Sequence, residues 1–378
     1  MCRKRLWLFN YDFELALSGR PALAASAKSP WYFLNRSALW LAPLVAEGDA
    51  IYMVEGPEPT CLRAISELLG FTPEIVTLKP EFESNANSEN AASLGQMYDL
   101  CYWGQPQACS VEVNSKITTA LLRRELLPKS WDMDSRAIKT KNKRVHEIAL
   151  ELDSFKKEVG AIDFFAKDPF GVSGQNLILN PKPNEMQTLK QWGRFSESVL
   201  AEEKLEIQKE ISLHFTYSEG AWAYEGITEL QTSTKGVYLG SYLPKDQKFA
   251  KLSELAPILD HFLNLGFLGN LGVDLILDQK GNYRLLEVNG RNTMGRVGLN
   301  WHKLSNRLGE TLFLKIPIQA PLEMSEIKFP KGLTPLSYSY CKRGWLTLLI
   351  RAKNLEEIEQ IWEKFKRKNK LSNIGLNL

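Results

Sequence analysis

Two apolar segments joined by a short polar turn constrain the fold of this chain more than any other feature. They span residues 271–278 and 283–289, and the turn between them contains a glycine, as many hairpins do. Because side chains alternate along a strand, a symmetric turn places Asp274 opposite Glu287. A bulge at Gly281 would shift this pairing by one residue. The sequence therefore predicts a β-hairpin that brings two carboxylates together.

Three oxygen ligands converge in this hairpin. Glu287 and Asn289 are two residues apart and share a face of their strand, while Asp274 lies opposite on the other strand. Two carboxylates and an amide oxygen suit a hard cation, Mg²⁺ or Mn²⁺, and two like charges this close need a cation or a proton. The alternative is an exposed sheet face, but the neighbouring residues are apolar on both faces. We predict a metal site at these three residues.

A second candidate site follows residues 162–167, a predicted strand that ends in Lys167. The loop after it is rich in small residues, and backbone N–H groups approach phosphate oxygens where side chains are small. Its candidate phosphate-binding residues are Gly171, Ser173 and Gly174, with Lys167 as a positive charge. An ordinary hairpin loop with one lysine is the alternative.

These features together resemble the ATP-grasp superfamily, which includes D-alanine–D-alanine ligase, glutathione synthetase, biotin carboxylase and carbamoyl phosphate synthetase. The metal-binding motif stands here as Gly269-x-x-Gly272-Val273-Asp274, followed by Glu287-x-Asn289-x-Arg291. Lys167, followed by a proline and a loop of small residues, is similar to the phosphate flap of that superfamily. The resemblance covers about the middle two-thirds of the chain and depends on the motifs in combination.

The resemblance implies further nucleotide-binding residues. Lys116, at the start of a predicted helix, corresponds to the first ATP lysine, although a lone lysine in a first turn is more often solvated. The segment 205–211 resembles the one that holds adenine, with Gln208 and Ile211 as its candidate residues. Superfamily members carry a glutamate for the ribose further along, and His214 takes the nearest position here.

Two arginines after the metal ligands complete the implied site. Arg291 lies beside the predicted metal and is the candidate catalytic residue, because a guanidinium there stabilises charge during phosphoryl transfer. Arg296 is a weaker candidate for holding a substrate carboxylate or phosphate, and a plain surface arginine is an equal alternative.

The predicted fold class is α/β (α+β). Residues 1–110 alternate short strands with helices and resemble the Rossmann-like preATP-grasp domain, without a GxGxxG after the first strand. Asn10, Asp12 and Glu14 follow that strand, where either a ligand crevice or a capped turn is expected. Residues 111–320 form the predicted ATP-grasp domain. Its first lobe, with the flap, is 111–203 and its second lobe, with the metal site, is 204–320. A proline-rich stretch then leads to a small βα extension, 321–378.

Composition excludes several other classes. The net charge of +3 over 378 residues gives no basis for nucleic-acid binding. Five cysteines without CxxC spacing fit a reducing, cytoplasmic setting better than a disulfide framework. No apolar run is long enough to cross a membrane, and polar residues interrupt the first apolar segment, so we expect neither a membrane anchor nor a signal peptide.

The resemblance implies an ATP- and Mg²⁺-dependent ligase that joins a carboxylate to an amine, or a thiol, through an acyl phosphate and releases ADP. Its partners would be small-molecule carboxylate and amine substrates, and a homodimer is left open. Two alternatives remain at this stage: an ATP-grasp phosphotransferase and a non-catalytic ATP-binding protein. The second usually loses metal ligands, which are all present here.

Overall fold

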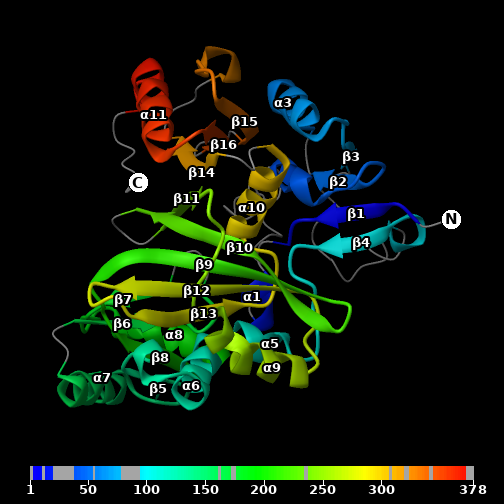
Figure 1. Cartoon of the computed structure of the whole chain (residues 1–378). Helices are drawn as coiled ribbons and strands as arrows, with labels where there is room; N and C mark the ends of the chain where they lie inside the picture. Colours follow the sequence, from blue (N-terminus) through cyan, green and yellow to red (C-terminus); the bar gives the residue numbers. More distant parts are fainter. Residues whose placement is uncertain are drawn as a thin grey trace.

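The computed structural model describes residues 3–10, 13–19, 38–53, 56–77, 94–160, 163–171, 176–233, 237–305, 309–318, 323–339 and 344–371. These residues form three β-sheets with helices packed around them (Figure 1). Parallel and antiparallel sheets occur together, which confirms the α/β (α+β) fold class. No helix in the described ranges is both long and apolar enough to cross a membrane.

The first sheet is parallel and has the strand order β3-β2-β1-β4. Its strands are β1 (Arg5–Leu8), β2 (Ala50–Met53), β3 (Glu74–Thr77) and β4 (Asp99–Tyr102). The segments between them contain α1 (Phe13–Leu17), η2 (Ala38–Leu44) and α3 (Pro59–Leu69). The strand order reverses between β1 and β4, and in open sheets ligands bind at such a point, beyond the carboxyl ends of the strands.

Local sequence explains where α3 begins and ends. The Glu58 side chain accepts a hydrogen bond from the backbone N–H of Cys61 at 3.1 Å, and a proline occupies the first helical position. Gly70 ends the helix with a φ of 79°, a conformation that glycine adopts without strain. The alternation predicted for this part of the chain is therefore present in the described residues.

The second sheet is antiparallel, with the order β5-β8-β6-β7. Its strands are β5 (Ser135–Lys139), β6 (Phe164–Lys167), β7 (Leu177–Leu179) and β8 (Ser198–Glu203). Helices α7 (Val145–Val159) and α8 (Met186–Ser196) pack with it. Before it come α5 (Ser110–Asn114), α6 (Lys116–Leu126) and η4 (Lys129–Trp131). Ser115 caps α6 as its sequence predicts, accepting the N–H of Thr118 at 3.3 Å.

The third sheet has eight strands in the order β13-β12-β9-β10-β11-β14-β16-β15. They are β9 (Ile207–Ser218), β10 (Ala221–Thr232), β11 (Tyr238–Leu243), β12 (Asn270–Asp278), β13 (Tyr283–Asn289), β14 (Glu310–Ile318), β15 (Leu333–Ser339) and β16 (Gly344–Ala352). The accompanying helices are η5 (Leu252–Leu255), α9 (Ala256–Asn264), α10 (Met294–Ser305), η6 (Met324–Glu326) and α11 (Leu355–Asn369). The edge strand β13 carries two of the three predicted metal ligands.

The C-terminal residues differ from the expected appendage. Pro317 and Pro335, taken from sequence as parts of a linker, lie in β14 and β15 instead. Through β16 these strands continue the large sheet, so no break in the sheet marks residue 320. Trp362 of α11 shares one hydrophobic cluster with Trp40 of η2. The sequence pattern could show the strands but not their partners, and the domain boundaries stay predictions.

Candidate functional site

The hairpin of β12 and β13 has the predicted pairing at its functional end. Asp274 lies opposite Glu287, and Gly272 lies opposite Asn289. Gly281 has a φ of 78° in the turn, and its N–H bonds the Asp278 carbonyl at 2.9 Å. This turn shifts the pairing by one residue, as a bulge would, and a second irregularity between Asp274 and Leu275 shifts it back. The two shifts cancel, so Asp274 faces Glu287 as predicted.

The three predicted metal ligands contact one another. The Asn289 amide donates from Nδ2 to Asp274 Oδ2 at 2.9 Å and to Glu287 Oε1 at 3.4 Å. The other Glu287 oxygen, Oε2, lies 2.5 Å from the Lys116 ammonium, so the first predicted ATP lysine pairs with a metal ligand. In the described ranges no group of three or more His, Cys, Asp and Glu could hold a metal, so a cation here would rely on the Asn289 oxygen as third ligand.

The two carboxyl groups titrate in opposite directions. Burial and the adjacent Glu287 carboxylate raise the pKa of Asp274 to about 7. Burial acts on Glu287 in the same sense, but the Lys116 ammonium outweighs it and holds the pKa of Glu287 below its usual range. Near neutral pH the Lys116 ammonium therefore balances the charge of Glu287, and Asp274 is partly protonated. A dication could replace this proton and the Lys116 charge, so the pair fits a Mg²⁺ site.

Both predicted phosphate lysines lie near the described start of the flap loop. Lys116 donates from Nζ to the Gly171 carbonyl at 2.7 Å, and its backbone N–H bonds the Pro169 carbonyl at 3.1 Å. Lys167, at the end of β6, forms an ion pair with Glu202. Ser173 and Gly174, also predicted to contact phosphate, lie outside the described residues.

Arg291 lies beside the metal ligands and is tied to the N-terminal part of the chain. Its Nη2 donates to Asn289 Oδ1 at 3.1 Å, and its Nε forms an ion pair with Glu14 of α1. Glu14 follows β1 at the point where the strand order of the first sheet reverses. Asn10 bonds both backbone groups of Gly104 there, at 2.8 and 2.9 Å. Of the three polar residues after β1, Glu14 contacts the predicted catalytic arginine, Asn10 holds Gly104, and Asp12 lies outside the described residues.

The residues predicted to bind adenine and ribose lie in different surroundings from those expected. The chain crosses from the second sheet to the third through Lys204–Glu206, between β8 and β9. Gln208 is exposed near the start of β9, just beyond this crossing, and Ile211 is buried in the core in mid-strand. The structure therefore does not bring Gln208 and Ile211 together at the crossing.

His214 is buried and hydrogen-bonded on both ring nitrogens, to Thr228 at 3.2 Å and Thr293 at 3.3 Å. Burial lowers its pKa to about 3, so it is neutral and part of the core. Glu210 instead faces the site, where burial raises its pKa and the charges of Lys167 and Glu287 act on it. Sequence reasoning missed Glu210, although alternation along β9 places it on one face with Ser212, opposite Asp274.

Arg296 is held by protein groups. Its Nη2 donates to Thr216 Oγ1 at 2.6 Å and its Nη1 to the Phe215 carbonyl at 3.3 Å, with Glu225 at 3.9 Å. Its substrate role stays a prediction, and the contacts support a structural role at least as well.

No family model matches the chain, and no curated protein matches it in sequence. Solved structures, however, match it over most of its length. The N5-carboxyaminoimidazole synthetase from Staphylococcus aureus, complexed with ADP, is 12% identical, with a TM-score of 0.55 over 96% of this chain and 97% of that chain. The biotin carboxylase domain of the Hydrogenobacter thermophilus 2-oxoglutarate carboxylase is 11% identical, with a TM-score of 0.58 over 100% and 91%.

A third structure, N5-carboxyaminoimidazole ribonucleotide synthetase from Thermus thermophilus, is 16% identical, with a TM-score of 0.54 over 87% of this chain and 94% of that chain. These neighbours are ATP-grasp enzymes, and the chain has the ATP-grasp fold that its motifs predict. At these identities the similarity establishes the fold, and the activity has to be argued from the site.

Proposed function

We propose that this protein is an ATP- and Mg²⁺-dependent ligase that joins a small-molecule carboxylate to an amine through an acyl phosphate, releasing ADP. The observation that carries the proposal is the facing pair Asp274 and Glu287, bridged by Asn289 and balanced by Lys116, within an ATP-grasp fold. ADP in the complex with the S. aureus neighbour supports nucleotide binding by this chain.

When bound, ATP would supply the phosphoryl group and a metal ion would neutralise the negative charge of its phosphates. Asp274, Glu287 and Asn289 would hold the metal ion, which could equally be Mn²⁺. Lys116 and Lys167 would contact the phosphates after giving up part of their pairing with Glu287 and Glu202.

Backbone groups of the flap would cover the phosphates. Gly171 of the flap already accepts a hydrogen bond from Lys116. Ser173 and Gly174 are the other flap residues predicted to contact phosphate. For the base we propose the crossing at Lys204–Glu206, because it joins the sheet that carries Lys167 to the sheet that carries the predicted metal ligands. Glu210 suits the ribose, since a carboxylate accepts from both of its hydroxyl groups. Gln208 and Ile211 are less well placed for either role.

Arg291 would stabilise the charge that develops on the transferred phosphoryl group. Its position beside Asn289 and its link to Glu14 fix the guanidinium before substrate arrives. The substrate would then enter between α1 and the loop that follows β13. One neighbour structure is a complex with 5-aminoimidazole ribonucleotide and another is a complex with bicarbonate. We therefore include an amine of the first kind and bicarbonate among the candidate substrates of this chain.

The test is a coupled assay for ADP release across a panel of carboxylates, bicarbonate and amines. We expect ADP and phosphate in equal amounts with a carboxylate–amine adduct. With ¹⁸O in the carboxylate, label should pass into phosphate. A phosphorylated alcohol as the stable product would instead establish a phosphotransferase, and AMP with pyrophosphate would exclude the acyl-phosphate route.

A further inference from the structure

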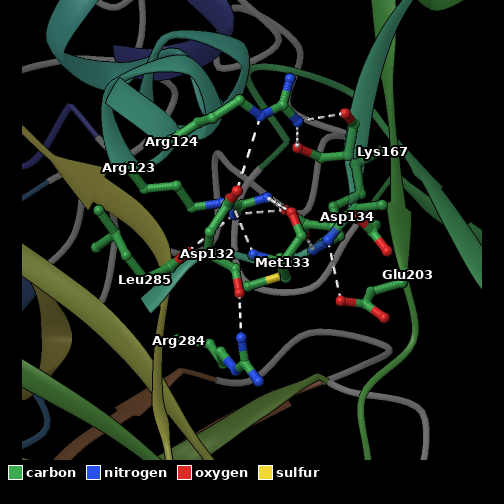
Figure 2. A network of polar contacts seen from close by, with 11 residues as sticks. Arg123, Arg124, Asp132, Met133, Asp134, Lys167, Glu203, Arg284 and Leu285 are labelled. Carbon is green, nitrogen blue, oxygen red and sulfur yellow. Dashed lines mark hydrogen bonds and ion pairs between the residues drawn. The ribbon is translucent and has the colours of Figure 1, made fainter. Parts of the chain in front are cut away.

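Arg123, on α6, is the fully buried centre of a polar network that reaches both the second and the third sheet (Figure 2). Its side chain is 0% exposed. A buried charge without partners strongly destabilises the folded state, so the contacts of this side chain must compensate for its burial. Sequence reasoning assigned no role to it.

Every nitrogen of the Arg123 guanidinium has a partner. Nη1 donates to the Leu285 carbonyl at 2.9 Å, Nη2 to the Met133 carbonyl at 3.0 Å and Nε to Asp132 Oδ1 at 3.1 Å. Nη1 also lies 2.7 Å from Glu202 Oε1. The planar, forked shape of a guanidinium suits several fixed acceptors at once, which a lysine does not.

The contact with Glu202 connects Arg123 to the predicted ATP lysine Lys167. Glu202 is 1% exposed and pairs through one oxygen with Arg123 and through the other with Lys167. Although burial opposes ionisation, the two cations hold the pKa of Glu202 below its usual range, so it is a carboxylate. Glu202 is therefore shared by two cations and neutralises Lys167 only in part. The second carboxylate on Arg123, Asp132, is itself shared with Arg124, 3.7 Å away.

The contact with Leu285 connects Arg123 to the metal site. Leu285 lies in the edge strand β13, two residues before Glu287 and beside the irregularity that restores the pairing of Glu287 with Asp274. Lys116 precedes Arg123 by two helical turns on α6, so both cations lie on the face of the helix that packs along β13. One helix thus contacts Glu287 through Lys116 and supports its strand through Arg123.

We infer that Arg123 is a positioning residue that holds Lys167 and strand β13, which carries predicted metal ligands, at a fixed spacing. By sharing Glu202 with Lys167, it also leaves part of the positive charge of Lys167 available for the phosphates of the nucleotide. This inference rests on the proposed ATP-dependent function. Without Arg123, Glu202 would neutralise Lys167 alone, and the Leu285 carbonyl would lose a buried donor.

The test compares ATP with adenosine, which lacks the phosphates, by calorimetry on the full chain with Mg²⁺. Arg123→Met removes the charge at similar size and should weaken ATP roughly tenfold or more, since one unit charge acts on the polyphosphate at low effective dielectric. Adenosine affinity should stay within about twofold. Arg123→Lys, which keeps the charge but fewer contacts, should restore ATP affinity only in part.

Arg124→Met is the matched control, because Arg124 neighbours Arg123 on α6 and is half exposed. It bonds Ser135 and lies 3.7 Å from Asp132, but it pairs with neither Glu202 nor the Leu285 carbonyl. The Arg124→Met variant should leave both affinities unchanged. Equal losses for ATP and adenosine in Arg123→Met, or no loss for either, would overturn the inference. If Arg123→Met gives no cooperative melting transition, Arg123→Lys decides: a selective ATP loss supports the inference and wild-type ATP affinity overturns it. Failure of the wild type to prefer ATP over adenosine would instead count against the proposed function.

Discussion

At the scale of single residues, the two facing carboxyl groups are not equivalent. Glu287 has Lys116 2.5 Å away, whereas Asp274 faces another carboxylate and a neutral amide. Removing the charge of Glu287 therefore leaves a lysine without its partner, and removing the charge of Asp274 relieves a repulsion.

We expect Glu287→Gln to lower the free energy of unfolding of the metal-free protein by about 1–3 kcal/mol. Asp274→Asn should leave it unchanged or raise it at pH 8. Thermal unfolding in EDTA at that pH measures both. Equal destabilisation by the two substitutions would contradict the charge arrangement described here.

The pH dependence provides a second prediction at this scale. The pKa of Asp274 rises from 3.8 in its ordinary state to about 7 in the folded protein, so the folded state binds this proton more tightly than the unfolded state. The stability due to this group is thus fully present below pH 4 and is lost as the pH rises towards 7. Melting temperatures from pH 4 to 8, in EDTA, should fall less in Asp274→Asn than in the wild type.

Saturating Mg²⁺ should reduce the same fall in the wild type, because a cation favours the ionised form of Asp274. A wild type and an Asp274→Asn variant with parallel profiles would show that Asp274 titrates normally.

At the scale of elements, β9 separates a core face from a site face. Ile211, Leu213 and Phe215 are buried in a hydrophobic cluster, and Glu210 and Ser212 face the opposite side. We expect Glu210→Gln to weaken adenosine roughly tenfold, because a charge-assisted hydrogen bond to the ribose is lost, while free adenine binding is unchanged.

Competition of adenosine and adenine against a fluorescent ATP analogue measures this difference. Gln208→Ala is the control, since Gln208 is exposed on the same strand. If Gln208→Ala weakens adenosine and Glu210→Gln does not, the original assignment of the adenine segment is restored.

The hairpin could be predicted from sequence because its strands are consecutive and alternation fixes which residues share a face. The position of Glu210 on one face with Ser212 carried a signal in the same alternation, which a motif comparison centred on Gln208 overlooked. The contact of Arg291 with Glu14 joins residues far apart in the chain, and no local pattern encodes it. Two partners of Arg123, Leu285 and Glu202, are of the same kind, because only the packing of α6 on β13 and β8 brings them to Arg123.

At the scale of the whole molecule, the Glu14–Arg291 pair links the segment after the first strand of the first sheet to the candidate site on the third sheet. Arg291→Ala should lower turnover roughly 10²-fold and leave ATP affinity nearly unchanged, if the guanidinium acts mainly on the transition state. Steady-state ADP release and calorimetry give the two quantities. Equal losses in turnover and ATP affinity would mean that Arg291 binds the ground state.

The hydrophobic core also spans the chain from one end to the other. Trp40 and Ile65 share a cluster with Trp362 and Phe365, and the indole N–H of Trp301 bonds the Trp40 carbonyl at 3.1 Å. These contacts join residues that are made early and late in synthesis. At roughly 5–20 residues per second, Trp362 follows Trp40 from the ribosome by about 15 to 60 seconds. During that interval the cluster that η2 shares with α11 cannot be completed, and the nascent chain is exposed to chaperones and to aggregation until α11 has been synthesised.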